Sequence, residues 1–476
     1  MGWHRNTLGP NALAIGLALL LLGCGQAPLQ DLAPRVRELA PRGFPRGIAL
    51  VIPAAANSAP RVARRPDRPT DDARLTSTQS PADWPTFRGQ HRDGVSLETG
   101  LARVWPAEGP KLAWIHRDLG RGYAGPAVVR DTIYILGTVE NQEAAIALDL
   151  ATGRRRWATP LGPIFQNPWG NGPRSTPTVD GQRVYVLTPA GRLAALSVDD
   201  GKVQWSRSLE QDFDGEAPEW GYSESPLIDG DKLIVTPGRE HALIALNKQT
   251  GAVIWQSTGL DDGAQYSSAL VARVGGQDLY LNMTDRGLVG VSARTGELTL
   301  RYEKTKNGTA ACTMPVVRGD CVYTTSGFGA GCGLVRLGAG ASSTNCQELY
   351  SSTIMKNQHG GVVLLDGSLF GYSDQTGWLC HDFASGELRW SDKESLPKGS
   401  LIAADGRLYC VSERDGTAAL IEPSTRGWSE KGRLFLSEST RLGRGKGGVW
   451  THPVVSHGRL FIRDQELLFA FDIQAK

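Results

Sequence analysis

The chain has 476 residues, of which 40% are hydrophobic and 21% charged, a composition typical of soluble globular proteins. Its formal net charge is only +2, a balance that does not suggest the clustered basic surface that nucleic-acid binding requires. We therefore expect no nucleic-acid partner. The 58 glycines and 13 tryptophans favour many short strands joined by tight turns.

The first residues are typical of an export signal. Arg5 is followed by an almost wholly apolar run at 12–23, which is too short to span a bilayer, since that needs about 20 residues. The run leads into LLGC, residues 21–24, which resembles the bacterial lipobox. The resemblance implies that residues 1–23 are a lipoprotein signal peptide and that Cys24 is lipidated. A plain signal peptide with an unmodified cysteine is the alternative. We expect an exported protein anchored to a bacterial membrane, on the periplasmic or outer-membrane face.

The segment 24–80 is rich in proline, alanine and arginine and has little periodicity. Such a composition cannot bury enough apolar surface to fold, so it predicts a disordered tether between the anchor and the folded body.

Six cysteines remain once Cys24 is assigned to lipid, and an exported compartment permits disulfides. Six cysteines allow 15 connectivities, so the pairing stays open and only a structural role is expected. They are Cys312, Cys321, Cys332, Cys346, Cys380 and Cys410.

An internal repeat organises the rest of the chain. Each unit has an apolar strand, a Gly/Asp turn, a strand with tyrosine, an Ala-Leu strand, and a Thr-Gly turn into a strand that ends on tryptophan. The alternating pattern and the Asp-Gly and Thr-Gly pairs indicate strands and hairpin turns, with no helical period. Eight units are recognised by the first-strand markers, which are 39 to 52 residues apart: Pro126, Pro177, Pro226, Ala269, Pro315, Val362, Leu401 and Pro453.

The two ends of the repeat region complement each other. The last unit stops at Phe471-Asp472-Ile473, before its final strand. Upstream of the first full unit, Lys111–Trp114 matches a final strand that has no unit before it. Pairing these two segments completes eight four-stranded units and closes a ring, which needs no polar caps. We therefore predict an all-β, eight-bladed β-propeller over residues 105–476.

The phrase Ala-x-Asp-x-x-Thr-Gly-x-x-x-Trp resembles the pyrroloquinoline-quinone (PQQ)-like repeat over about residues 105–476. That family includes eight-bladed quinoprotein dehydrogenases and the lipoprotein subunit of the outer-membrane barrel-assembly machinery. The preceding segment DWPTFRGQHRDGVSLETGL also resembles the leader of secreted planctomycete-type proteins labelled polyvinylalcohol dehydrogenase. We expect residues 81–104 to form a strap over one face of the ring. The resemblance implies that tryptophans fill the gaps between blades, here Trp114, Trp157, Trp205, Trp255 and Trp390.

Candidate binding residues come from the loops before the first strands, because these loops converge at one end of a propeller axis. The loops combine aromatic and polar side chains, which suits a ligand or peptide site. The candidates are Trp169, Arg174, Trp220, Tyr222, Glu224, Tyr266, Lys356, Gln358, His359, Trp450 and His452. Glu224 is a possible Ca²⁺ ligand or base, and His359 or His452 a possible proton-transfer group. The alternative is that these side chains fill the axis and form hydrogen bonds with one another.

These features favour a binding or scaffold protein of the cell envelope, a monomeric propeller whose partner is an envelope protein, a glycan or a small ligand. A PQQ- and Ca²⁺-dependent alcohol-type dehydrogenase is the main alternative, and a hydrolase or lyase is a third. The family's enzymes hold the quinone against an adjacent-cysteine disulfide, and this sequence has no Cys-Cys pair. No catalytic residue can be matched. We expect no cofactor and no metal site, and PQQ with Ca²⁺ only under the alternative.

Overall fold

The computed structural model describes residues 80–274, 276–338 and 346–476. The predicted signal peptide, the lipidated Cys24 and the tether up to residue 79 lie outside the described residues. The described part is almost entirely β: its helical segments are α1 (Leu209–Phe213) and the 3₁₀ turn η2 (Arg239–His241). None of its helices is long and apolar enough to cross a membrane. The all-β prediction is confirmed.

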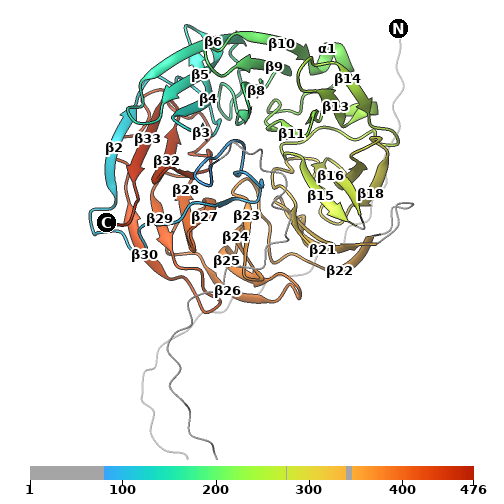
Figure 1. Cartoon of the computed structure of the whole chain (residues 1–476). Helices are drawn as coiled ribbons and strands as arrows, with labels where there is room; N and C mark the ends of the chain where they lie inside the picture. Colours follow the sequence, from blue (N-terminus) through green and yellow to red (C-terminus); the bar gives the residue numbers. More distant parts are fainter. Residues whose placement is uncertain (1–79, 275, 339–345) are drawn as a thin grey trace, which may run out of the picture. The chain divides into compact units, whose positions relative to one another are not determined.

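Eight antiparallel sheets form a ring, with first strands around the centre and fourth strands at the rim (Figure 1). Blade 1 contains β3 (Ala127–Val129), β4 (Thr132–Val139), β5 (Gln142–Asp149) and β6 (Arg155–Pro163). Blade 2 contains β7 (Thr178–Asp180), β8 (Arg183–Leu187), β9 (Arg192–Ser197) and β10 (Val203–Ser208). Blade 3 contains β11 (Leu227–Asp229), β12 (Lys232–Val235), β13 (Ile244–Asn247) and β14 (Val253–Gln256). Blade 4 contains β15 (Leu270–Val274), β16 (Gln277–Thr284), β17 (Gly287–Ser292) and β18 (Leu298–Tyr302).

The second half of the ring follows the same order. Blade 5 contains β19 (Val316–Arg318), β20 (Cys321–Ser326), β21 (Gly331–Leu337) and β22 (Cys346–Ser352). Blade 6 contains β23 (Val362–Leu365), β24 (Ser368–Ser373), β25 (Gly377–Asp382) and β26 (Leu388–Asp392). Blade 7 contains β27 (Gly399–Ala404), β28 (Arg407–Ser412), β29 (Ala418–Ile421) and β30 (Glu430–Leu434). Blade 8 contains β31 (Val454–Ser456), β32 (Arg459–Asp464) and β33 (Leu467–Asp472), completed by β2 (Lys111–His116).

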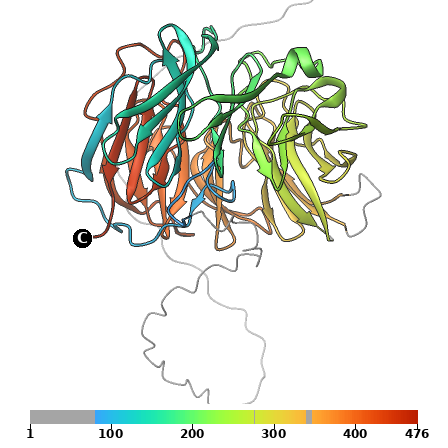
Figure 2. The same cartoon turned by 45° about the horizontal axis from the view of Figure 1, so that its top comes forward.

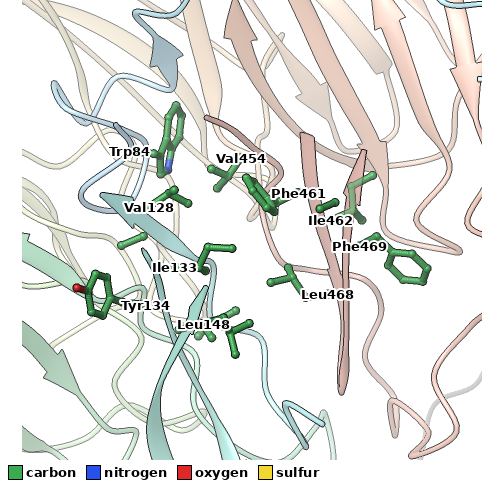
Figure 3. Packing of buried hydrophobic residues seen from close by; sticks show 14 of the residues in the cluster. Trp84, Val128, Ile133, Tyr134, Leu148, Val454, Phe461, Ile462, Leu468 and Phe469 are labelled. Atoms are coloured by element: carbon green, nitrogen blue, oxygen red, sulfur yellow. The ribbon is translucent and has the colours of Figure 1, made fainter. Parts of the chain in front are cut away.

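The ring is closed by β2, which supplies the missing fourth strand of blade 8. It pairs antiparallel with β33, with Lys111 opposite Asp472 and Ile115 opposite Phe469. The largest apolar core lies across this closure and joins blades 8, 1, 2 and 7. Figure 3 shows its centre, where residues of blade 1 such as Ile133 lie beside residues of blade 8 such as Phe461. The predicted ring and its closure are confirmed.

At most blade junctions, an aromatic ring on the fourth strand of one blade covers a glycine turn of the next blade. Trp157, on the fourth strand of blade 1, donates its indole N–H to the Val198 carbonyl of blade 2 (3.1 Å). A Cβ atom on Gly201, in the Thr-Gly-type turn, would lie 2.6 Å from that indole, and Gly201 has φ +70°. Glycine is needed here both for the left-handed backbone and for the close approach. Trp114, Trp205 and Trp255 make the same contacts with Gly153, Gly251 and Gly296, while Trp390 donates to the Ser424 carbonyl.

The six cysteines of the body form no disulfides, since each is a free thiol in the described part of the chain.

In blade 5, a tyrosine replaces the tryptophan of the repeat. Its fourth strand carries Tyr350 instead of tryptophan, and this ring lies against Gly386 of blade 6. Its hydroxyl donates to the Phe383 carbonyl (2.9 Å), so a tyrosine performs the same locking contact.

The strap, residues 81–104, is the segment that crosses the centre of the ring (blue in Figures 1 and 2). Trp84 forms a two-way backbone bridge with Val128 of β3, and the short strand β1 (Val95–Ser96) adds a parallel fifth strand to blade 7. Asp83 accepts hydrogen bonds from the Arg130 N–H and from His457, which lie in first-to-second-strand turns of blades 1 and 8. The strap therefore enters the axis from the face that carries these turns, here called the turn face.

Candidate functional site

The opposite face, here called the loop face, carries the loops that lead from one blade into the first strand of the next. All the candidate loops of the sequence lie there, because every first strand runs in the same direction along the axis. The loops 167–174 and 218–225 precede β7 and β11, and 355–361 and 447–452 precede β23 and β31. The ring thus brings segments almost 300 residues apart in the sequence to one face.

Three candidate aromatic residues form a continuous row over blades 2, 3 and 4. Trp169 and Trp220 meet edge to face with centroids 6.2 Å apart, and Trp220 stacks on Tyr266 at 5.2 Å. The Tyr266 hydroxyl accepts the Trp220 backbone N–H (3.2 Å), which fixes the pair. Trp169 at the end of the row is 41% exposed. We call Trp169, Trp220 and Tyr266 the aromatic row.

Arg174 lies beside the aromatic row. Its guanidinium carbon is 5.1 Å from the Phe165 ring centroid and 5.7 Å from that of Tyr123. It donates to the carbonyls of Gly170 and Gly172 at 2.6 and 2.5 Å, and within the described residues it forms no ion pair. Burial lowers the pKa of Arg174, but a guanidinium stays charged at neutral pH. The site therefore offers a fixed positive charge next to exposed aromatic surface.

A second group of candidates lies across the axis, on loops of blades 5 to 8. His452 Nε2 donates to the His359 carbonyl (2.7 Å), and the Trp450 indole N–H donates to Glu413 Oε2 (3.0 Å). The same Glu413 oxygen lies 3.2 Å from His359 Nε2. The Trp450 ring is 5.3 Å from Tyr123, which connects this group to Arg174. We call His359, His452, Trp450 and Glu413 the axial polar cluster.

The charges in the axial polar cluster do not favour proton transfer at neutral pH. Burial lowers the pKa of both His359 and His452 to about 3, helped by the nearby charge of Lys398 for the first and of Arg88 for the second. Both imidazoles are therefore neutral and weakly basic at pH 7. Because a general base works best with a pKa near the working pH, these histidines are better suited to hydrogen bonding than to catalysis.

Lys356 and Gln358 lie at the edge of this cluster and have polar partners. Lys356 Nζ donates to Gln375 Oε1 (3.0 Å). Gln358 Oε1 accepts from Lys398 Nζ, which also forms an ion pair with Asp374 (2.8 Å). Their side chains are partly exposed, so they are accessible from the loop face but already held in place.

Tyr222 and Glu224 are the candidates that the structure does not bring to the surface. Both are 1% exposed, and Tyr222 donates its hydroxyl proton to the Pro237 carbonyl (2.9 Å). Glu224 accepts hydrogen bonds from the Thr236 N–H (2.7 Å) and hydroxyl (3.0 Å), from the Ala269 N–H (3.4 Å) and from the Asn282 amide (3.4 Å). Tyr222 packs between blades 2 and 3, and Glu224 joins blades 3 and 4, both below the loop face.

Glu224 does not fit the calcium site that a quinoprotein needs. Two backbone N–H groups and a hydroxyl point at its carboxylate, and N–H groups cannot turn to accept a cation. Within the described residues, no three His, Cys, Asp or Glu side chains are grouped so that they could hold a metal. The Glu224 carboxylate is therefore held by protein donors and is not presented to a cation.

Several residues of this face were missed from the sequence. Tyr123 and Lys398 lie in the loops before the first strands of blades 1 and 7, so the rule that found the other candidates could have found them. Glu413 lies in the turn between the second and third strands of blade 7, a position that also faces the loop side. Asn357 orders its loop, because its side chain bonds both the N–H and the carbonyl of Gly361 (2.9 and 3.0 Å).

The protonation of Glu224 should be visible in the pH dependence of stability. Burial raises the pKa of Glu224 from 4.5 to about 7, so the folded state binds its proton more tightly than the unfolded chain does. The resulting stabilisation is fully present below pH 4.5 and is lost as the pH rises through 7. We expect the free energy of unfolding of wild type minus that of Glu224→Gln to fall by roughly 3 kcal/mol from pH 4.5 to 7 and then level off. A difference that stays constant in urea titrations across this range would contradict the assignment.

Comparisons with known proteins agree with this architecture. A family model described as outer membrane protein assembly factor BamB matches residues 141–391. The chain is 26% identical over 357 residues to the outer membrane protein assembly factor BamB of Escherichia coli (strain K12), covering 70% of this chain and 79% of that protein.

Two solved structures show the same fold. BamB from Moraxella catarrhalis has a TM-score of 0.50 at 16% identity and covers 73% of this chain and 98% of its own. Quinohemoprotein alcohol dehydrogenase from Comamonas testosteroni has a TM-score of 0.61 at 12% identity and covers 84% and 82%. The family model spans more than half of the sequence. The chain therefore belongs to the PQQ-like repeat β-propeller family whose model is described as outer membrane protein assembly factor BamB.

Proposed function

We propose that this protein is an exported, lipid-anchored propeller of a bacterial envelope that binds a partner protein on its loop face. The observation that carries the proposal is the aromatic row, which ends in the exposed Trp169 and is flanked by the unpaired charge of Arg174. Tryptophan, tyrosine and arginine are the residues that most often dominate the free energy of protein–protein binding. The family model that matches this chain is described as an outer membrane protein assembly factor, which supports a protein as the partner.

The geometry of the row suits binding because its side chains are already ordered. Trp220 is held between Trp169 and Tyr266, and a backbone hydrogen bond links Trp220 to Tyr266. A partner would therefore meet rings that lose little conformational freedom on association. Lys446 Nζ lies 5.7 Å from the Trp169 ring centroid, so Lys446 and Arg174 both place positive charge beside Trp169. The exposed Glu219 lies at the other end of the row, where its charge acts on Tyr266. We infer that the partner presents an apolar patch with acidic neighbours.

The quinoprotein alternative has less support. The chain is only 12% identical to the alcohol dehydrogenase. A similarity at this level shows a shared fold and does not indicate a shared activity. The carboxylate of Glu224 is occupied by protein donors, and both axial histidines have a pKa far below 7. We therefore propose that the loop face binds its partner without a quinone and without calcium.

Replacing the aromatic row should weaken partner binding. A photo-crosslinking residue at position 169 is used to capture the partner in the native envelope, and mass spectrometry identifies it. We expect Trp169→Ala combined with Trp220→Ala to weaken binding of the purified partner by roughly 30-fold or more, because two anchor rings are lost. Calorimetry or surface plasmon resonance measures the affinity.

Leu388→Ala is the matched control, since Leu388 is also 41% exposed but lies on the rim strand β26. Equal affinities of the double variant and the control would show that the loop face is not the binding surface. Crosslinks from position 169 to saccharide only would identify a glycan as the ligand instead.

The membrane anchor can be tested separately. Cys24→Ser removes the thiol that would carry the lipid, so we expect the protein to move from the membrane fraction to the soluble envelope fraction. Immunoblots of the two fractions measure the shift. Retention of the variant in the membrane fraction would contradict the lipid anchor. The binding proposal would be unaffected, because the variants of the aromatic row test it independently.

A further inference from the structure

Two arginines of the strap lie buried near the axis of the propeller. Arg88 is 4% exposed and Arg92 is 5% exposed. Both have a left-handed backbone, with φ +64° and +56°. Such backbone costs about 1 kcal/mol for a non-glycine residue and is concentrated at functional sites. The strap therefore holds both side chains in strained, enclosed positions.

Both guanidinium groups bond mainly to backbone carbonyls. Arg88 Nη2 donates to the carbonyls of Asp93 (3.0 Å) and Val362. Arg92 donates to the carbonyls of Ser225 (2.8 Å) and Pro226 (3.1 Å) and to a threonine hydroxyl. Among the described residues neither forms an ion pair, and Arg88 Nη1 and Arg92 Nε are buried without a hydrogen-bond partner.

The two side chains remain charged at neutral pH. Burial lowers the pKa of each to about 10, which is still well above 7. The charge of Asp93 acts on Arg88, and that of Glu224 acts on Arg92. The pKa of Glu224 is about 7, so this carboxyl supplies only part of a compensating charge. Buried charges without a counter-charge are costly in a protein interior. Neither carboxyl forms an ion pair with these arginines within the described residues, so both guanidinium groups are only partly compensated.

The free donor of Arg88 lies in a polar setting. Gly361 leaves the room for it, because a Cβ atom there would collide with Arg88 Nη1 and lie 3.1 Å from His452 Cε1. His452 Nδ1 is also buried without a partner. Arg88 Nη1 and the edge of the His452 ring thus lie against the same glycine, between the strap and the axial polar cluster.

We propose that a small oxyanion, a carboxylate or phosphate, binds at Arg88, between the strap and the axial polar cluster. The anion accepts from Arg88 Nη1 and adds negative charge next to a guanidinium that Asp93 compensates only in part. Charge-assisted hydrogen bonds of this type are about twice as strong as neutral ones. Because the site lies beneath the loop face, it does not depend on the aromatic row or on its partner.

Thermal unfolding of the purified full chain tests the site. Melting curves are recorded at pH 7.5 in sodium phosphate, sodium acetate and sodium chloride of equal ionic strength. We expect a saturable rise in Tm of roughly 2–4 °C over chloride, as follows from ligand binding to the folded state alone. The arm that shows the rise identifies the oxyanion as phosphate or carboxylate.

Variants assign the effect to Arg88. Arg88→Gln is expected to lose at least half of the shift, and Arg88→Lys is measured as well in case the glutamine variant fails to fold. Arg407→Gln is the control, because Arg407 is also buried and bonds backbone carbonyls, those of Arg103 and Gly406, but lies at the turn face and forms an ion pair with Glu422 (3.8 Å). It should keep the full shift. Wild-type curves that coincide in all three salts overturn the proposal, whatever the variants do.

Discussion

The pairing of β2 with β33 is the contact on which the rest of the molecule depends. It joins residues some 350 positions apart and gives blade 8 its fourth strand. Without it the first and last blades would expose two long sheet edges and an open apolar core, because the largest core lies across this junction. Closure also sets the direction of every first strand around one axis, so the loop face exists only in the closed ring.

The same kind of contact holds neighbouring blades together at most junctions of the ring. An indole or phenol on the rim covers a glycine turn of the next blade and donates to a neighbouring carbonyl, as Trp157 does with Gly201 and Val198. The strap adds a different kind of contact at the centre, where it reaches the first strands of several blades through backbone carbonyls. The rim is thus held by apolar burial and the axis by buried polar groups, which makes the axis the place for recognition.

Much of the fold could be predicted because its determinants are local and repeated. The Thr-Gly…Trp phrase reports a turn and a strand in each copy, and the unpaired Lys111–Trp114 segment predicted the closure. The loops that line the face could be predicted in the same way. The burial of individual side chains could not be predicted. Tyr222 and Glu224 lie in a loop rich in aromatic and polar residues, yet the local backbone directs both side chains inward between two blades. Arg88 and Arg92 bond mainly to backbone carbonyls. Because every residue has a carbonyl, these partners could not be recognised from the sequence.

Mapping a disulfide across the closure tests the account most directly. Ile115 lies opposite Phe469 in the pairing of β2 with β33, so oxidation of Ile115→Cys/Phe469→Cys should give a linked peptide within one chain by mass spectrometry. Ile115→Cys/Leu468→Cys should give none, because neighbouring residues of a strand point to opposite faces. Equal linkage in both variants, or linkage only between separate chains, would contradict the closed eight-bladed ring.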